Sequence, residues 1–427
     1  MYKQNGSKSR RSNRTSKNKH VRHSSNRGST DRSGGRYKSK RRGSGNWGNK
    51  NRRLVRSKIA HSTYISEAIE QTPEGTYIPE HNFSEFGLSP VLATNISDVN
   101  YINPTKIQDQ AIPQILNGKD LLGIASTGSG KTGAFLIPMI DMALRDKNNR
   151  ILIVTPTREL ASQIQTEFRK FAKSTNLKMT LVIGGENIRT QIHLLKNKPQ
   201  FVVATPGRLM DLERRNKINL KSFNTIVLDE VDQMLDMGFV ADIKLVISKL
   251  AEQRQSLFFS ATMSQKEETL ANTLLKDPIK LEVHKQSPLK SIHQDIVKIK
   301  SKGEKLQVLY ELLGKTEFHK VLIFSGTKMY ADKISTSLRQ QGFKADSLHG
   351  GKSQNKRSKV LNSFRQDRID VLVATDVAAR GIDIPDISHV INYDEPASVN
   401  DYIHRIGRTG RIGKKGTALT FVLGKWD

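Results

Sequence analysis

The chain has 427 residues, enough for two or three domains, and it contains no cysteine, which excludes disulfides, thiolate metal sites and cysteine nucleophiles. Its formal net charge is +29, of which residues 1–60 contribute +19, because they carry 20 Lys or Arg side chains against the single acid Asp31. No run approaches the roughly 18–20 apolar residues of a membrane span, and the N-terminus lacks the apolar core of a secretory signal, so neither is expected.

Residues 1–53 are low in complexity and consist mainly of Arg, Lys, Ser, Gly and Asn. Such a segment buries too little apolar surface to offset the entropy of ordering, so a disordered basic tail is predicted. An organelle transit peptide is the alternative, although these residues offer almost no face for an amphipathic helix. Residues 54–80 are a transition with scattered apolar side chains, including Ile59 and Tyr64, that could dock as a short helix. We therefore assign 1–80 to the tail and transition.

From residue 81 onward, short apolar runs alternate with longer amphipathic segments. The runs expected to be buried strands are 121–125, 151–155, 201–205, 225–229, 256–260, 321–324, 371–375, 389–393 and 418–422. Between them, residues 158–172 place Leu160, Ile164 and Phe168 on one helical face. This alternation predicts parallel sheets with right-handed crossovers. The polar stretch 284–292 divides two α/β domains, 81–283 and 293–427.

The segment ASTGSGKT (125–132) follows a predicted strand and opens a predicted helix. Backbone N–H groups of small residues can turn around phosphate oxygens at such a helix N-terminus. The residues expected to form this cradle are Ser126, Thr127, Gly128, Ser129 and Gly130. Lys131 would reach the β- and γ-phosphates and Thr132 would bind Mg²⁺. Because the usual first glycine is Ala125 here, an ordinary glycine-rich turn is the alternative.

About 100 residues later, TIVLDEVD (225–232) places two carboxylates at the end of an apolar strand. Asp229 is expected to hold Mg²⁺, and Glu230 to polarise the attacking water. A solvated acidic turn is the alternative, but the upstream phosphate loop favours a nucleoside triphosphatase.

Taken together, these ordered motifs resemble the DEAD-box family of RNA helicases, from about Phe83 to Val422. The motif that names the family is D-E-V-D here, with Val231 in place of the usual alanine. The resemblance implies two tandem RecA-like α/β domains, ATP as the nucleotide, Mg²⁺ as the metal and RNA as the partner.

The resemblance also implies roles around the nucleotide. In NPTKIQDQAIP (103–113), Gln108 would bond the adenine edge with Thr105 in support, and Tyr101 and Phe83 would be the aromatic residues near the base. In SAT (260–262), Ser260 and Thr262 would bond near Asp232 and couple hydrolysis to strand separation.

The second domain contains YIHRIGRTGR (402–411), which matches the family's motif at the interdomain cleft. By resemblance, His404, Arg408 and Arg411 belong to the catalytic set, and both arginines would approach the γ-phosphate. Arg405 would support the cleft through ion pairing. Asp383, in ATDVAARGIDI (374–384), would face the ribose.

Further loops resemble the family's RNA-gripping motifs, and their hydroxyls, glycine N–H groups and arginines suit phosphate oxygens. The residues expected to bind RNA are Pro156, Thr157, Arg158, Gly185, Thr205, Arg208, Thr327, Gly350, Gln354, Arg357 and Thr375. Gly326 departs from the family pattern, which often has asparagine there. Contacts to 2′-hydroxyls would favour RNA over DNA.

We expect an RNA-stimulated ATPase that unwinds short RNA duplexes or remodels RNA–protein complexes, with the basic tail anchoring RNA. A nonenzymatic RNA clamp or annealing protein and a DNA-directed relative are the alternatives. The compact core favours a bacterial stand-alone helicase in the cytoplasm, with a nuclear protein as the alternative. Ribosome assembly and RNA decay are the candidate pathways for its partners. No membrane association is expected.

Overall fold

In the computed structural model, the described residues are 59–68, 77–126, 128–283, 291–382, 384–410 and 415–424. The predicted disordered tail therefore lies almost entirely outside the described residues, as does 284–290 of the predicted hinge. The described chain contains two parallel sheets, one of seven strands and one of six. The prediction of two tandem RecA-like domains is confirmed.

The first sheet has the strand order β3-β4-β2-β5-β6-β1-β7, and every pairing in it is parallel. Its strands are β1 (Leu121–Ala125), β2 (Ile151–Val154), β3 (Met179–Val182), β4 (Phe201–Ala204), β5 (Thr225–Leu228), β6 (Gln255–Ser260) and β7 (Ile279–Val283). Its helices are α1 (Pro90–Asp98), α2 (Lys106–Leu116), α3 (Lys131–Arg145), α4 (Arg158–Phe171), α5 (Ile188–Lys196), α6 (Pro206–Arg214), α7 (Val231–Asp236), α8 (Val240–Ser248) and α9 (Gln265–Leu274), with short 3-10 turns η2 (Phe83–Phe86) and η3 (Leu220–Ser222).

The second sheet has the order β10-β11-β9-β12-β13-β8 and is also parallel throughout. Its strands are β8 (Ile292–Ile299), β9 (Val321–Phe324), β10 (Ala345–Leu348), β11 (Val371–Ala374), β12 (His389–Asn392) and β13 (Gly416–Leu423). Its helices are α10 (Lys305–Leu313), α11 (Lys328–Gln340), α12 (Gln354–Arg365), α13 (Asp376–Ala379) and α14 (Val399–Ile406). Because β8 begins at Ile292, the last residue of the predicted hinge belongs to this sheet.

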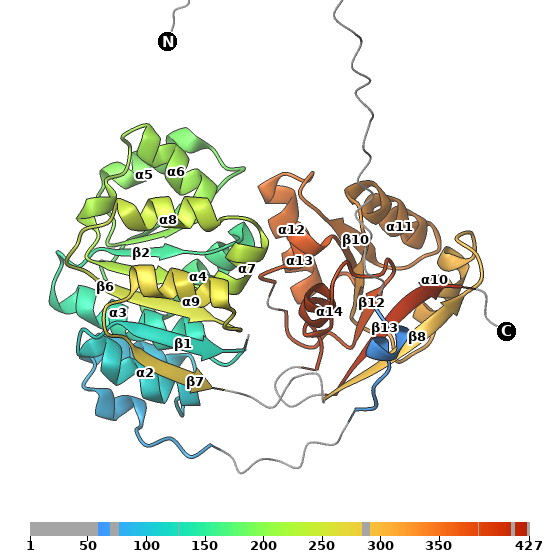
Figure 1. Cartoon of the computed structure of the whole chain (residues 1–427), viewed down its shortest axis with the longest axis horizontal. Helices are drawn as coiled ribbons and strands as arrows, with labels where there is room; N and C mark the ends of the chain where they lie inside the picture. The colour runs from blue at the N-terminus through green and yellow to red at the C-terminus, as the bar shows by residue number, and fades with distance from the viewer. Residues whose placement is uncertain are drawn as a thin grey trace, which may run out of the picture. The chain divides into compact units, whose positions relative to one another are not determined.

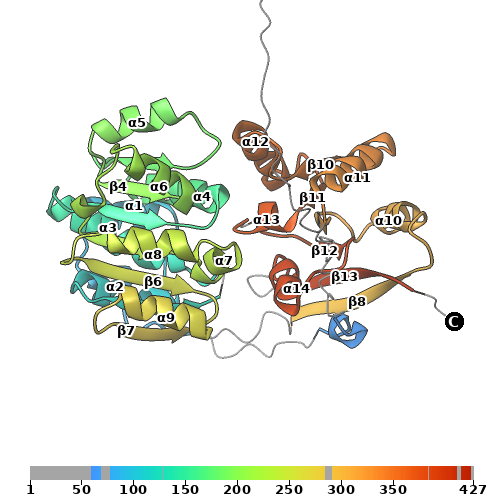
Figure 2. The same ribbon diagram turned by 45° about the horizontal axis from the view of Figure 1, so that its top comes forward.

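Each sheet carries an apolar core on both faces, and helices cover both faces (Figures 1 and 2). In α4, the predicted apolar face is buried, with Ile164 and Phe168 in the core of the first sheet. Burial on two faces explains why the central strands are continuous apolar runs.

All nine predicted strands are present, and the four that the apolar runs did not predict, β3, β7, β8 and β10, are the edge strands of the two sheets. β7 shows the cause: in IKLEV, Lys280 and Glu282 are exposed and alternate with partly or fully buried residues. An edge strand with polar side chains has no continuous apolar run, so the pattern used for buried strands cannot find it.

The transition segment docks on the second domain, although the first domain follows it in sequence. The 3-10 turn η1 (His61–Tyr64) contacts β8, and Ser66 pairs with Gln294 as an antiparallel bridge. In Figures 1 and 2 this turn is the short blue helix beside β8. By contrast, Tyr77 and Glu80 bond Asp109 of α2 in the first domain. The covalent chain therefore connects the two domains before β1 as well as after β7.

Among the helices of the described residues, none is both long and apolar enough to span a bilayer.

Candidate nucleotide and RNA site

The predicted phosphate loop connects β1 to α3. Gly128 and Gly130 have φ values of +77° and +99°, which place both in the left-handed region that favours glycine. Gly130 is also the N-cap of α3, so the loop turns its backbone toward the helix N-terminus. Lys131 is buried, and its Nζ donates to the Ala125 carbonyl at 2.7 Å. This intramolecular acceptor is one that a phosphate oxygen could replace. Thr132 follows in the first turn, and Thr127 lies outside the described residues.

Gln108 is buried directly beside this loop. Its Oε1 accepts from the Thr105 N–H at 3.0 Å, and its Nε2 donates to the Gly130 carbonyl at 3.1 Å. A Cβ at Gly130 would lie 2.5 Å from Thr105 Oγ1, and one at Gly133 would lie 2.6 Å from Gln108 Nε2. The sequence prediction gave this amide to adenine, whereas the structure shows it joining α2 to the phosphate loop. Each amide atom keeps capacity for one further hydrogen bond, so the adenine contact stays a prediction.

The two aromatic residues predicted near the base, Phe83 and Tyr101, have ring centroids 6.1 Å apart. Tyr101 also packs edge-on against Phe171 of α4, and burial raises its pKa to about 12. A Cβ at Gly133 would lie 3.5 Å from the Tyr101 ring. The aromatic pair therefore lies beside the start of α3, next to Gln108.

Asp229 and Glu230 follow β5, whose neighbour β6 separates it from β1. Both acids are buried, and Glu230 has a φ of +54°, an uncommon conformation for a non-glycine residue. The Glu230 N–H donates to Asp229 Oδ1 at 3.0 Å. Such backbone strain is concentrated at functional sites.

Burial raises the pKa of Asp229, and burial together with the Asp229 charge raises that of Glu230, while the nearby Lys131 lowers both. Glu230 Oε2 and both carboxylate oxygens of Asp232 are buried without a hydrogen-bond partner among the described residues. Buried acceptors of this kind are costly unless a ligand, cation or water satisfies them.

These residues fit a magnesium ion. Mg²⁺ is usually held by one or two carboxylates together with substrate phosphates and water, so a cage of three protein ligands is not required. In the described part of the chain no group of three or more His, Asp or Glu residues forms such a cage. Asp229 and Thr132 are the residues that would hold the ion.

Ser260 ends β6 and accepts a hydrogen bond from the Asp232 N–H at 3.3 Å, as its predicted place near Asp232 requires. Thr262 differs, because its hydroxyl donates to Glu267 at 3.4 Å. Glu267 also forms the capping box of α9 with Ser264, so the structure places the Thr262 hydroxyl on Glu267, and the expected role of Thr262 near Asp232 stays a prediction.

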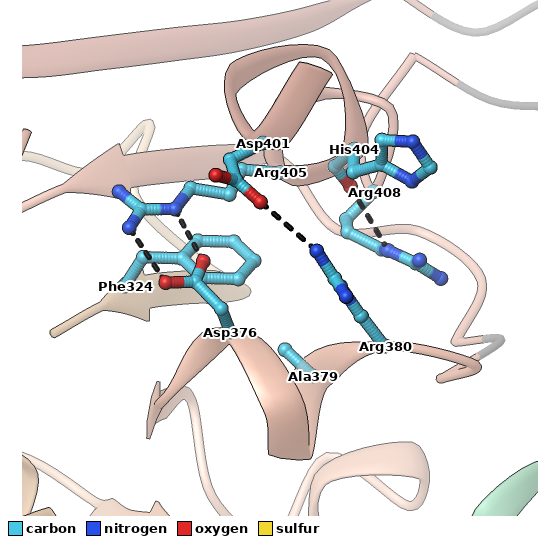
Figure 3. A pocket seen from close by; sticks show the side chains of 8 residues that line it. All are labelled: Phe324, Asp376, Ala379, Arg380, Asp401, His404, Arg405 and Arg408. Carbon is cyan, nitrogen blue, oxygen red and sulfur yellow. Dashed lines mark hydrogen bonds and ion pairs between the residues drawn. The ribbon is translucent and has the colours of Figure 1, made fainter. Parts of the chain in front are cut away.

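His404 of α14 and Arg408 of the turn after it are the predicted catalytic residues of the second domain that the structure describes (Figure 3). Arg405 donates to both oxygens of Asp376, at 2.5 and 2.9 Å, which confirms its predicted ion pairing. Arg408 is buried, and it donates to the carbonyls of Ile382 and His404 at 2.7 and 3.3 Å. The Arg405 fork fixes α14 against α13.

Electrostatics connect α14 to the acids of the first domain. The Arg408 charge is one of those that lower the pKa of Glu230. Burial lowers the pKa of His404, and Asp232 opposes that shift. Arg380 also lies 3.7 Å from Asp236 at the end of α7. Lys131, Glu230, Asp232, His404 and Arg408 therefore act on one another, whereas Arg411 and Asp383 lie outside the described residues.

Three of the arginines predicted to bind RNA lie near one another: Arg158 follows β2, Arg208 follows β4, and Arg357 belongs to α12. Arg158 lies against Gly184 and Gly185, so closely that a Cβ at Gly185 would clash with its guanidinium. Arg208 donates to Gln191 Oε1 at 2.9 Å and to the Glu186 carbonyl. Burial is the largest cause that lowers the pKa of Arg158, and the like charges of Arg357 and Arg208 lower it further. Such a concentration of positive charge suits a phosphate backbone.

The remaining predicted RNA residues lie at strand ends or helix starts. Thr157 and Thr327 cap α4 and α11 through their hydroxyls, and Thr205 and Thr375 are the N-caps of α6 and α13. Pro156 and Gly350 lie in the loops before α4 and α12, and Gln354 starts α12. Helix N-termini favour anions, so these positions suit phosphate contacts.

Glu159 was not predicted as a functional residue. It is buried in the first turn of α4, where its Oε1 lies 2.9 Å from Arg357 Nε and accepts from Gln354 Nε2 at 3.3 Å. The ion pair joins the first domain to α12 of the second. In the sequence, the only signal was that Glu159 is an acid directly after the predicted RNA residue Arg158. That signal does not identify an ion-pair partner 198 positions away.

Strand order separates two sets of residues along the same edge of the first sheet. In the first domain, the phosphate loop and the acids follow β1 and β5, with Ser260 at the end of β6 between them, and the predicted RNA residues follow β3, β4 and β2, which are also neighbours. In parallel sheets, ligands bind outside the carboxyl ends of strands. The carboxyl end of the first sheet thus has two halves. The predicted nucleotide residues lie on one, the nucleotide half, and the predicted RNA residues lie on the other, the RNA half.

Comparisons with known proteins agree with this geometry. The sequence model for DEAD/DEAH box helicases matches residues 105–270, and that for the helicase conserved C-terminal domain matches 304–413. The ATP-dependent RNA helicase CshA of Listeria monocytogenes is 43% identical over 343 residues, covering 80% of this chain and 66% of the relative. The ATP-dependent RNA helicase dbp2 of Neosartorya fischeri is 42% identical over 365 residues, covering 82% of this chain and 67% of the relative. This chain belongs to the DEAD-box helicase family. It spans about two thirds of the length of these relatives.

Solved structures of this family show the same fold. The S. cerevisiae protein Dbp5 bound to RNA and ADP BeF3 is 33% identical, with a TM-score of 0.70, covering 80% of this DEAD-box chain and 90% of Dbp5. Mss116 bound to ssRNA and UDP-BeF is 29% identical, with a TM-score of 0.72, covering 82% and 77% of the two chains.

Proposed function

We propose that this DEAD-box chain is an RNA-stimulated ATPase that couples ATP hydrolysis to local unwinding of short RNA duplexes or to remodelling of RNA–protein complexes. The observation that carries the proposal is the strand order of the first sheet, which places the nucleotide half and the RNA half side by side at the carboxyl ends of its strands. Relatives named as ATP-dependent RNA helicases and a related structure bound to RNA and ADP BeF3 support it.

In the proposed reaction, Lys131 exchanges the Ala125 carbonyl for phosphate oxygens, and Glu230 orients the attacking water. Asp229 and Thr132 would hold Mg²⁺, and the ion would supply positive charge against the phosphates. Arg408 leaves its carbonyl partners and places its guanidinium against charge that develops in the transition state. His404, Asp232 and Ser260 position these groups.

RNA is held through its sugar–phosphate backbone by Arg158, Arg208 and the helix N-termini, so little sequence specificity is expected. The basic tail of residues 1–53 adds nonspecific, salt-dependent affinity. We further propose a cytoplasmic location and partners in ribosome assembly or RNA decay.

The decisive experiment measures ATP hydrolysis by the full chain with and without a short RNA duplex, in the wild type and in Glu230→Gln. Stimulation of the wild type by RNA, with turnover reduced at least about hundredfold in the variant, is expected. Glu252→Gln, at an exposed position of the same domain, is the matched control.

Equal turnover in Glu230→Gln and wild type, or turnover that RNA does not stimulate, would favour the nonenzymatic clamp. A DNA duplex of the same sequence tests the DNA-directed alternative, which predicts equal unwinding of both. Deleting residues 1–53 should weaken RNA affinity and flatten its salt dependence, while basal ATPase activity persists.

A further inference from the structure

The segment Ile59–Ala68 lies against the element that carries the second-domain catalytic residues. Tyr64 has no exposed surface, and its ring packs in a cluster with Ile292 of β8, Tyr402 and Ile406 of α14, and two residues of β13. The Tyr64 and Tyr402 rings are 4.9 Å apart at 61°, an edge-on geometry that aromatic pairs favour. One side chain of the transition segment therefore contacts Tyr402 of α14 and shares an apolar cluster with Ile406, one turn further along the helix.

The backbone of the same segment is paired with the sheet. The Ser66 N–H donates to the Gln294 carbonyl at 2.9 Å, and the Gln294 N–H donates to the Ser66 carbonyl at 2.8 Å. β8 is an edge strand, so this bridge satisfies backbone groups that the sheet itself leaves without a strand partner. The segment is thus bound by main-chain hydrogen bonds as well as by the buried ring.

Gln294 continues the connection into the helix, because its Oε1 accepts from the Tyr402 hydroxyl at 2.9 Å. Two residues beyond Tyr402 is His404, and Arg408 Nε donates to the His404 carbonyl. The Arg405–Asp376 pair fixes α14 to α13 on another side. Without the segment, the cluster that contains Tyr402 and Ile406 of α14 would lose one of its buried aromatic rings.

We propose that Ile59–Ala68 is an N-terminal brace and that Tyr64 is a positioning residue, which holds α14 so that Arg408 and His404 are ready for ATP hydrolysis. Tyr64 touches no nucleotide or RNA residue and acts only through Tyr402 and Ile406. The brace rests on the proposed ATPase function and adds to it a part of the chain that precedes both RecA-like domains.

The Tyr64 hydroxyl allows the contribution of the ring to be tested separately from that of hydrogen bonding. It is buried without a hydrogen-bond partner among the described residues, so the ring rather than the hydroxyl supplies the contact. Tyr64→Phe should therefore keep the brace and Tyr64→Ala should remove it. Tyr310→Ala is the matched control, because Tyr310 packs in a different cluster of the same domain.

The first arm compares steady-state ATPase activity of these variants and of two truncations, one lacking residues 1–55 and one lacking 1–68. Tyr64→Ala and the longer truncation should lower RNA-stimulated kcat at least about fivefold, with KM for ATP changed less than about twofold, since the first domain binds the nucleotide. Tyr64→Phe and the shorter truncation should retain wild-type kcat. Equal kcat in Tyr64→Ala and wild type, or an equal loss in Tyr310→Ala, overturns the brace.

The second arm separates failure of the brace from failure of the ATPase proposal. Hydrogen exchange of the peptide 399–408 is compared between the two truncations without nucleotide. Faster exchange when 56–68 is absent supports the brace even if no ATPase activity is detected, whereas unchanged exchange overturns it. Absence of RNA-stimulated turnover in both the wild type and the shorter truncation would reject only the proposed function.

Discussion

Gln108 Nε2 donates to the Gly130 carbonyl at 3.1 Å, so the residue expected to recognise adenine also holds the phosphate loop. The same side chain accepts from the Thr105 N–H and completes the capping box at the start of α2. The predicted adenine contact and the phosphate loop are therefore linked through one amide, and loss of that amide should affect the binding of both the base and the phosphates.

Gln108→Ala should raise the Kd for ATP roughly thirtyfold, because two buried hydrogen bonds worth about 1 kcal/mol each are removed beside the loop. Calorimetric titration of the protein with ATP, and separately with inorganic triphosphate, measures the change in Kd. Both ligands should bind more weakly; unchanged triphosphate affinity would show that Gly130 does not depend on Gln108. Gln114→Ala, half-buried on the same helix, should bind both ligands normally.

The buried Glu230 predicts a pH dependence of folding. Its pKa is raised to about 7, above the value in an unfolded chain, so the folded state binds more protons than the unfolded state from about pH 4.5 to 7. Stability contributed by this protonation is fully present below that range and is lost as pH rises through about 7.

Glu230→Gln should consequently raise the melting temperature of the nucleotide-free protein by a few degrees at pH 8, with little change at pH 4.5. Thermal unfolding at both values checks this, with Glu252→Gln as the exposed control. A variant that melts at the wild-type temperature at pH 8 would mean that the buried charge is already compensated.

Gly185→Ala should reduce RNA affinity about tenfold. Gly185 has a φ of +78°, and a Cβ there would clash with the Arg158 guanidinium, so the variant must displace Arg158 from its predicted charge-assisted phosphate contact. Filter binding over a range of salt concentrations should also give a shallower slope. At Gly207, in the first turn of α6, a Cβ would meet nothing within 4 Å, so Gly207→Ala should bind RNA normally. An equal loss in both variants would argue against the Arg158 contact.

The Glu159–Arg357 ion pair predicts coupling between the two domains. Glu159→Gln and Arg357→Gln should each weaken RNA-stimulated kcat/KM, because each leaves the other buried charge unpaired. The double variant should lose less than the two separate losses combined, with a coupling energy of about 1–3 kcal/mol. Additive losses would show that the pair does not act as a unit, and Lys359→Gln, exposed on α12, is the control.

Much of this protein was predictable because its chemistry is written in short, contiguous motifs. The apolar runs identified the nine central strands, and the phosphate loop and the D-E-V-D motif identified a nucleotide site before any fold was known. The edge strands β3, β7, β8 and β10 were missed because only buried strands need a continuous apolar pattern.

The sequence by itself determined which residues are the candidates for the chemistry, since a lysine after a glycine-rich loop or an acid after an apolar strand has the same local geometry wherever the fold places it. Only the tertiary structure decided which of them meet. Strand order set β5, β6 and β1 apart from β3, β4 and β2, packing joined Glu159 to Arg357, and the early residue Tyr64 was placed against Tyr402. These relationships depend on nonlocal burial and pairing, which connect positions hundreds of residues apart and leave no periodic signal in the chain.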